Sequence, residues 1–171
     1  YGVGDVIPIN ISFGAADTVS GTPQLTLSTG SSNAVVDYTS GSGGTTLTFN
    51  YTVASGHVSS DLDYVATNSL ALNGGTINDA AGNAATLTLA SPSASGSLGA
   101  NKALVIDGVV PTVTNVTSTT SDGTLKIGDV AAITVTFSEA VTVITTNGFP
   151  QLTLETGTSD AVVNYASGSG G

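Results

Sequence analysis

Apolar and polar residues alternate along several stretches of the chain. Alternation with a period of two puts one set of side chains on each face of an extended strand, which is typical of half-buried antiparallel strands. The apolar positions are Ile7, Ile9, Ile11 and Phe13; Leu47, Phe49, Tyr51 and Val53; and the shorter pairs Leu25 and Leu27, Leu87 and Leu89, and Leu104 and Ile106. Clusters of Gly, Ser, Asn and Asp separate these runs, and helical spacing is absent. The pattern predicts an all-β protein whose short strands form an antiparallel β-sandwich.

Pro8 lies inside the first alternating stretch. Proline has no backbone N–H and cannot donate to a β-ladder, so it is confined mainly to edge strands and bulges. We therefore expect the strand around Pro8 to lie at a sheet edge or to be bulged there.

The end of the chain repeats its beginning. Residues 22–44 read TPQLTLSTGSSNAVVDYTSGSGG, and residues 149–171 read FPQLTLETGTSDAVVNYASGSGG. Upstream, YGVGDVIPINISF at residues 1–13 is matched by LKIGDVAAITVTF at residues 125–137, so the period is near 124 residues. This period is too long for a solenoid unit and indicates an array of whole domains, each with its own core.

Two matched positions of the repeat exchange an acid for an amide. Asn33 corresponds to Asp160, and Asp37 corresponds to Asn164. Each position retains a side-chain oxygen rather than a charge. This favours a hydrogen bond to nearby backbone over a catalytic role.

The charge balance excludes two classes of partner. The net charge is −10, with two Lys, no Arg and twelve acidic residues. Binding to nucleic acid by counterion release, or to anionic membrane surfaces, needs cationic side chains, so neither partner is expected. No apolar run approaches the roughly 18 residues of a membrane-spanning helix, and the absence of Cys excludes disulfides. Cations are the expected small partners.

Several runs resemble the repeated immunoglobulin-like domains of large secreted bacterial adhesins and other surface proteins. They are DGTLKIGDVAAITVTFSEAVTV, PQLTLETG, AVVNYASGSGG, DLDYVATNSLALNGGTINDAAGNAATLTL and ALVIDGVVPTVTNV. The resemblance implies tandem immunoglobulin-like β-sandwiches in an extracellular location at the bacterial cell surface. It also implies a role as a spacer, with adjacent repeats of the same chain as partners.

The repeat boundary is expected where a strand ends and Pro111 opens a new one. Residues 1–108 are then one repeat without its first strand, and residues 109–171 begin the next, incomplete one. A half sandwich exposes unpaired strand edges, so we do not expect this stretch to be an autonomous folding unit. The missing strands would come from the continuing chain, or from a neighbouring copy by strand donation, giving a fibre or surface layer.

Three carboxylates are candidates for a calcium site at the joint between repeats. Asp107 lies in the linker, and Asp122 and Asp129 lie in the first turn region of the next copy. Calcium takes several oxygen ligands, and sharing it across a joint would stiffen that joint. The alternative is that Asp122 belongs to a turn and that Asp129, which matches Asp5, has a local structural role.

Asp61 and Asp63 are a weaker calcium candidate. Side chains two apart in an extended segment point to the same side, so these like charges repel unless they are hydrated or bridged by a cation. The alternative is a solvated loop flank.

Catalysis lacks support in the sequence. His57 is the only His, Cys is absent, and the only two Glu residues are Glu139 and Glu155, both in the second copy. We therefore expect no enzyme, and an exposed loop position for His57. A ligand-binding adhesin module or a strand-exchanging filament subunit is the alternative to a spacer. An exposed groove with clustered aromatic or acidic residues would favour the ligand-binding module.

Overall fold

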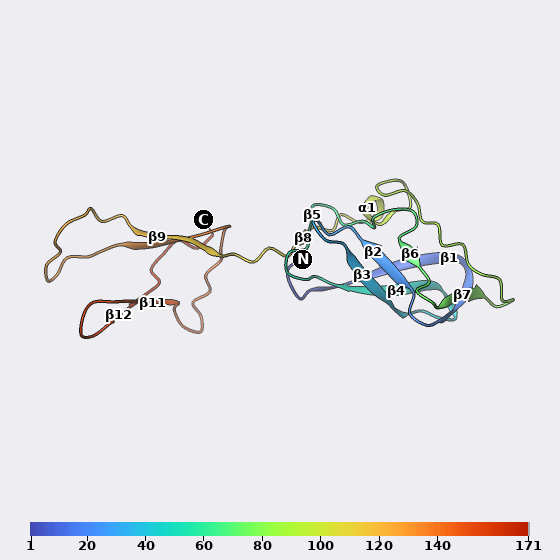
Figure 1. The fold of residues 1–171 in the computed structure, drawn as a ribbon, viewed down its shortest axis with the longest axis horizontal. Coiled ribbons are helices and arrows are strands. Elements are labelled where there is room, and N and C mark those ends of the chain that lie inside the picture. The colour runs from blue at the N-terminus through green and yellow to red at the C-terminus, as the bar shows by residue number, and fades with distance from the viewer. Residues whose placement is uncertain (171) are drawn as a thin grey trace. The chain divides into compact units, whose positions relative to one another are not determined.

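The computed structural model describes residues 1–170, and strands make up 39% of the chain and helix 2%. All paired strands run antiparallel. The expected all-β class is therefore confirmed. The chain divides into two compact units, unit 1 (Tyr1–Val110) and unit 2 (Pro111–Gly171), which are described separately below (Figure 1).

Unit 1 is built around a six-stranded sheet with the order β6-β2-β3-β4-β1-β7, and a two-stranded sheet joins β5 to β8. The first half of β3 pairs with β2, and its second half pairs with β4, with a register irregularity between Tyr38 and Ser40. The strands are β1 (Val6–Ser20), β2 (Gln24–Leu27), β3 (Ala34–Ser40), β4 (Gly44–Thr52), β5 (Val58–Ser59), β6 (Leu70–Ala71), β7 (Thr76–Asp79) and β8 (Ile106–Asp107).

The alternating residues form the core of unit 1. Strand β1 pairs with β4 so that Ile9 lies opposite Phe49 and Ile7 lies opposite Tyr51. All four of these side chains are buried, as are Leu25 and other apolar residues of β2, whereas the intervening polar side chains are mostly exposed. The period-two prediction is therefore confirmed for these strands, because the buried face follows the apolar positions.

Pro8 lies at an open sheet edge, as expected. Between Val6 and Ser12, β1 pairs with β4 and with no other described strand, since β7 pairs only with Asp17–Ser20. The Val53 amide donates to the Asp5 carbonyl at 2.9 Å. Because hydrogen-bonded pairs alternate along an antiparallel ladder, odd-numbered residues of β1 direct their backbone groups to β4 and even-numbered ones direct theirs away. The missing N–H of Pro8 therefore faces the open edge and disturbs no ladder.

The sequence pattern also predicts strands at residues 61–72, 86–89 and 103–106 of unit 1, and these three predictions fail over most of their length. Residues 61–72 contain only β6, residues 86–89 contain no strand, and residues 103–106 contain only the start of β8. The backbone groups there bond to scattered partners: Leu89 donates to the Thr67 carbonyl and Leu62 donates to the Leu104 carbonyl. A short helix, α1 (Leu98–Asn101), was also unexpected, and it is capped by the Ser97 side chain, which accepts from the Ala100 amide.

Unit 2 contains two separate strand pairs. One pair is β9 (Val113–Ser118) with β10 (Ile133–Phe137), and the other is β11 (Gln151–Leu154) with β12 (Ala161–Asn164). No residue between 111 and 170 is buried, and Ile127 is fully exposed. These strands therefore leave their apolar side chains largely open to solvent. That residues 109–171 begin another repeat stays a prediction.

Candidate functional site

The repeated sequence forms the same hairpin in both units. In unit 1, Gln24 pairs with Asp37, and its side-chain amide donates to the Asp37 Oδ1 at 2.8 Å. In unit 2, Gln151 pairs with Asn164 and donates to the Asn164 Oδ1 at 2.9 Å. Asp37 and Asn164 thus accept the same hydrogen bond, each through a side-chain oxygen. The donor is a glutamine across the hairpin rather than the backbone group that the sequence suggested.

The loops around this hairpin are also equivalent in the two units. The Thr29 hydroxyl donates to the Ser32 carbonyl at 2.7 Å, and Thr156 donates to the Ser159 carbonyl at the same distance. Thr29 is fully buried. The shared sequence therefore specifies local geometry down to individual hydrogen bonds.

Asp129 has the local structural role suggested by its match to Asp5. The Asp5 Oδ2 accepts from the Gly2 amide at 2.9 Å, and the Asp129 Oδ2 accepts from the Lys126 amide at 2.9 Å. The backbone amide of each aspartate also donates a hydrogen bond, from Asp5 to the Gly2 carbonyl and from Asp129 to the Lys126 carbonyl. Each carboxylate therefore closes a tight turn just before a strand region.

The other two carboxylates of the expected joint site differ in their surroundings. Asp107 ends β8, and its Oδ1 accepts from the Val109 amide at 3.2 Å. Asp122 lies in an exposed loop of unit 2. Within residues 1–170, no group of three or more His, Cys, Asp and Glu side chains is placed to hold one metal ion. Calcium binding by these residues stays a prediction.

Asp63 is a buried carboxylate that organises the long loop before β8. Its side chain is only 8% exposed, so it is not the solvated loop flank considered above. Oδ1 accepts from the Tyr64 amide and Oδ2 from the Ser93 amide, both at 2.9 Å. Ser97 and Gly99 also hydrogen-bond to this carboxylate. One side chain therefore holds the backbone at Tyr64, the loop at Ser93 and the start of α1.

The hydrogen bonds to Asp63 outweigh the cost of burial. Burial by itself would raise the pKa of Asp63, but the bonds from Ser93, Tyr64, Ser97 and Gly99 hold that pKa below its ordinary value. Asp63 is therefore ionised in the folded protein at neutral pH. These neutral donors compensate its charge.

Asp61 is exposed but is directed to the same place as Asp63. Its Oδ1 accepts from the Leu104 amide at 3.3 Å. A Cβ atom built on Gly99 would lie 3.0 Å from the Asp63 Oδ2 and 3.5 Å from the Asp61 Oδ2. The predicted convergence of the two carboxylates is therefore confirmed, and it occurs over the glycine backbone of α1.

Residues 78–83 read NDAAGN, a composition that predicts a hairpin turn, and the structure has a turn there. Asn78 bridges to Ala84, and Gly82 has a φ of 87°. The Asp79 carboxylate accepts from the Asn83 side chain at 2.9 Å and from the Asn83 and Ala81 amides. These hydrogen bonds lower the pKa of Asp79. Closing this turn therefore explains why an acid occupies position 79.

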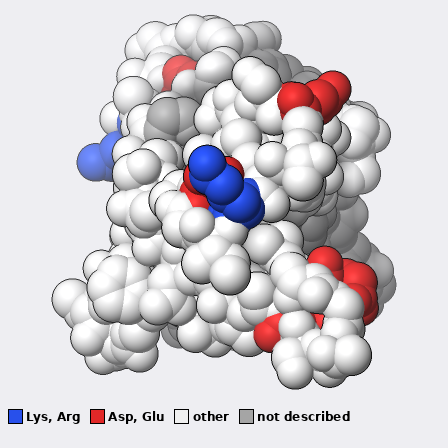
Figure 2. All heavy atoms as spheres, turned by 90° about the vertical axis from the view of Figure 1, so that its left-hand side faces the viewer, with Lys and Arg blue, Asp and Glu red and all other residues white. Residues whose placement is uncertain are grey.

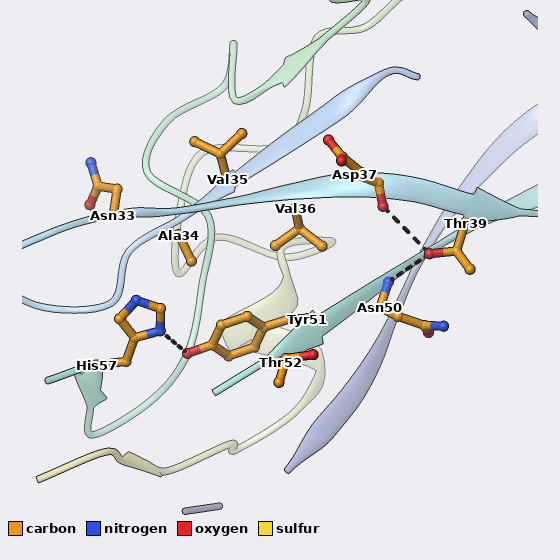
Figure 3. Close-up of a pocket in the computed structure, with 10 residues that line it drawn as sticks. All are labelled: Asn33, Ala34, Val35, Val36, Asp37, Thr39, Asn50, Tyr51, Thr52 and His57. Atoms are coloured by element: carbon orange, nitrogen blue, oxygen red, sulfur yellow. Dashed lines mark hydrogen bonds between the residues drawn. The ribbon is translucent and has the colours of Figure 1, made fainter. Parts of the chain in front are cut away.

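His57 is half-buried rather than an exposed loop residue. Its Nδ1 accepts from the Ala54 amide at 3.2 Å and bonds the Tyr51 hydroxyl at 2.9 Å, with the two rings stacked at 5.8 Å (Figure 3). Tyr51 is 1% exposed, and burial raises its pKa. The imidazole therefore anchors the buried end of Tyr51, which explains its position without catalysis.

The hollow beside His57 has the character of a polar surface. It measures about 510 Å³ and lies between β3 and β4 (Figure 3). Asp37 is its one carboxylate and is bonded by Gln24, while the Thr39 hydroxyl accepts from the Asn50 amide at 3.2 Å. Its only aromatic rings belong to Tyr51 and His57, which stack on each other. The hollow thus lacks the clustered acids or exposed aromatics expected of a ligand groove.

Charged side chains are sparse on the surface that Figure 2 draws, where uncharged residues cover most of the face. No helix among the described residues is long and apolar enough to cross a membrane. Comparison with protein-family models, curated proteins and solved structures found no match to this chain.

Proposed function

We propose that this chain is a structural spacer segment of a large bacterial cell-surface or secreted adhesin-like protein, made of tandem immunoglobulin-like β-sandwich repeats. The observation that carries this proposal is the duplicated hairpin, in which Gln24 and Asp37 are replaced by Gln151 and Asn164 with the same hydrogen bond. A hairpin that is copied with its local structure but without the charge of Asp37 is suited to setting length. A recognition site would need the charge or shape of its side chains to be kept.

The content of the hollow supports a spacer over a ligand-binding module. Sugar-binding surfaces usually stack ligands on exposed aromatic rings, and the Tyr51 ring is buried. The surface is uncharged over much of its area, so its solvation depends little on ion pairs and salt. An extracellular array of such modules would keep its reach across changing ionic strength.

Calcium is proposed as the stiffening cation, held by Asp107, Asp122 and Asp129, with Asp61 and Asp63 as a weaker site. Calcium prefers carboxylate and carbonyl oxygens, and the chain offers both at these positions. A ligand that binds only the folded state raises stability by mass action. Binding at a joint would also reduce bending between repeats.

The test compares the native chain with Asp107→Asn and Asp129→Asn, each in calcium and in chelator. We expect calcium to raise the melting temperature of the native chain and to narrow its distribution of dimensions in small-angle scattering, and each substitution to abolish both effects. Asp37→Asn is the matched control, because Asn164 already occupies that position in the second copy. Identical melting and scattering with calcium and with chelator would contradict the calcium proposal.

The spacer role has a separate test. Chains with increasing numbers of the 124-residue period should lengthen by a constant increment and unfold under force in equal, repeated steps. Glycan and protein arrays probed with the same chains should show no saturable binding. A specific ligand captured by the native chain would favour the ligand-binding module instead.

A further inference from the structure

A buried carboxylate without a hydrogen-bond partner lies where β1 meets β7. Asp17 is 4% exposed, and its Oδ2 accepts no hydrogen bond from any residue that the structure describes. Removing a carboxylate from water without a donor or a cation is costly, so buried charges in proteins are usually paired or coordinate a metal ion. The described side chains and amides do not supply that partner to Asp17.

Strand β1 has a neighbouring strand on both sides at this residue. Asp17 lies opposite Gly44 of β4 on one side and opposite Asp79 of β7 on the other. Its carbonyl accepts from the Gly43 amide at 2.7 Å. The isolation of the Asp17 carboxylate is therefore not that of an open sheet edge.

The second copy of the repeat has an isolated acid in the same part of its sequence. The same backbone hydrogen bond from the SGSGG loop aligns Val141 with Asp17, and therefore Glu139 with Ala15. The Glu139 Oε1 is also buried and accepts no hydrogen bond in the described structure, even though the backbone beside it is bonded to Thr112. Ala15 lines the same hollow as Asp17. Both copies thus place one unpartnered acid here, from positions two residues apart.

A second carboxylate lines the hollow beside Asp17. This hollow measures about 290 Å³ and is lined by residues 13–15, by Asp17 and Asp79, and by residues 83–86. Asp17 and Asp79 are directly opposed in the antiparallel register, so their side chains share one face of the sheet, with Cβ atoms roughly 5 Å apart. Like charges in this arrangement repel each other, and a cation between them would remove the repulsion.

The turn after β7 fixes the second carboxylate. The Asp79 Oδ1 accepts from the Ala81 and Asn83 amides, and its Oδ2 accepts from the Asn83 side chain at 2.9 Å. These bonds hold the pKa of Asp79 below its ordinary value, so the carboxylate is ionised at neutral pH. A carboxylate oxygen has two lone pairs, so Oδ2 retains one for a cation. Asn83 donates through its nitrogen and retains its side-chain oxygen as a further ligand.

This set of donors suits calcium. Calcium takes six to eight oxygen ligands in flexible geometry, whereas magnesium demands near-ideal octahedral geometry. Zinc favours nitrogen and sulfur ligands, and the residues lining this hollow include no His or Cys. A hollow of about 290 Å³ also has room for several waters to complete the coordination, since each occupies about 30 Å³.

We propose that the hollow between Asp17 and the turn after β7 is a calcium site, with Asp17, Asp79 and Asn83 as its protein ligands. Bound calcium ties the end of β1 to that turn within unit 1. With two protein carboxylates, the site belongs to the weak class, with a Kd on the order of 10⁻⁴–10⁻³ M. It is separate from the carboxylates proposed above to stiffen the joint between repeats, and either proposal can fail without the other.

The test uses the isotope-labelled full chain, with Mn²⁺ as a paramagnetic probe and Ca²⁺ as its competitor, because both ions prefer oxygen ligands. Millimolar Mn²⁺ should broaden the amide resonances of Asp17, Asn83 and Ala85, and Ca²⁺ should restore them. Asp17→Val is the decisive variant, because the second copy already has Val141 at this position. It should weaken binding at Asn83 and Ala85 at least tenfold, and Asp17→Asn, which keeps the size of the side chain, should do the same.

Two controls separate this site from other acids of the chain. Asp37→Asn removes the same charge from an exposed position and should leave the broadening at Asn83 unchanged. The Leu104 and Val109 amides, which are bonded to Asp61 and Asp107, report on the sites proposed above. Their response to Mn²⁺ should be the same in Asp17→Val as in the native chain.

Stability in chelator gives a readout that needs no bound ion. Asp17→Val should melt at or above the temperature of the native chain, because it removes an uncompensated buried charge. A variant that melts clearly below the native chain in chelator would show that Asp17 has a partner within the fold and would overturn the proposal. So would broadening at Asn83 and Ala85 that survives Asp17→Val, the absence of any broadening there, or equal broadening around Asp37, which would indicate an adventitious ion only.

Discussion

Replacing Asp63 with Asn is expected to destabilise unit 1 by about 3 kcal/mol at neutral pH. The carboxylate is 8% exposed and accepts from the Tyr64 and Ser93 amides at 2.9 Å, with further bonds from Ser97 and Gly99. An amide of the same size keeps one acceptor oxygen and turns an NH₂ group towards the remaining donors. Two of the four donors then lack a partner, at roughly 1–3 kcal/mol each.

Asp61→Asn is the matched control for this substitution. Asp61 lies two residues away, is exposed, and accepts one bond from the Leu104 amide at 3.3 Å. Exposed substitutions of this kind usually change stability by less than about 0.5 kcal/mol. Urea unfolding at pH 7, followed by circular dichroism, should therefore shift the midpoint strongly for Asp63→Asn and slightly for Asp61→Asn, with similar slopes.

The pH dependence gives a second, independent readout. The folded-state pKa of Asp63 is lowered, so its contribution to stability is fully present above the unfolded-state pKa and is lost as the pH falls through the folded-state value. The difference in unfolding free energy between the native chain and Asp63→Asn should begin to narrow as the pH falls towards the ordinary aspartate pKa of 3.8, and it should continue to narrow below that value. Equal destabilisation by both substitutions, or a gap that does not narrow in acid, would refute the structural role assigned to Asp63.

Two further predictions concern His57, in the loop after β4, and Gly108, which packs against that loop. Gly108→Ala should destabilise unit 1 by roughly 2 kcal/mol or more in the same urea assay. The reason is that a Cβ at this position would collide with the backbone carbonyls of Ala54 and His57. A variant as stable as the native chain would contradict this packing. His57→Ala should lower the melting temperature, because it removes the partner of the Tyr51 hydroxyl. No hydrolase assay should show turnover that depends on His57. Turnover that His57→Ala abolishes would contradict the expectation that the chain is not an enzyme.

The strands that could be predicted from the sequence are those whose burial is one-sided. In β1 and β4 the apolar residues face the core and the polar residues face solvent, so Ile9 and Phe49 are found by alternation alone. Residues 61–72 fail because Leu62, Asp63 and Tyr64 are consecutive and all buried. Alternation is lost where loop backbone, rather than a strand face, packs against the core.

The importance of Asp63 could not be deduced from its own position in the sequence. Its donors at Ser93, Ser97 and Gly99 lie about thirty residues further on, in a Ser- and Gly-rich stretch whose composition predicts only a loop. The one available local signal was Ser97, a preferred helix N-cap residue. Four helical residues are too few to show a periodic pattern, so α1 was missed.

Comparing the two copies of the repeat shows at which matched positions only a side-chain oxygen is kept and at which the negative charge is kept as well. At Asp37 and Asn164 the same hydrogen bond is made by an acid and by an amide, so charge is not required there. At Asp5 and Asp129 both copies keep the acid, although an amide oxygen would accept the same turn-closing bond. Turn closure explains the oxygen at Asp129 and leaves the charge unexplained.

A cation bound to the remaining oxygen of Asp129 would explain why the acid is kept. Asp129→Asn distinguishes the two contributions, because it preserves the acceptor for the Lys126 amide and removes only the charge. In chelator the variant should therefore melt like the native chain, and in calcium it should lack the native increase. A loss of stability in chelator of the same size as in calcium would mean that the charge serves the turn itself, and calcium would then have no part at this position.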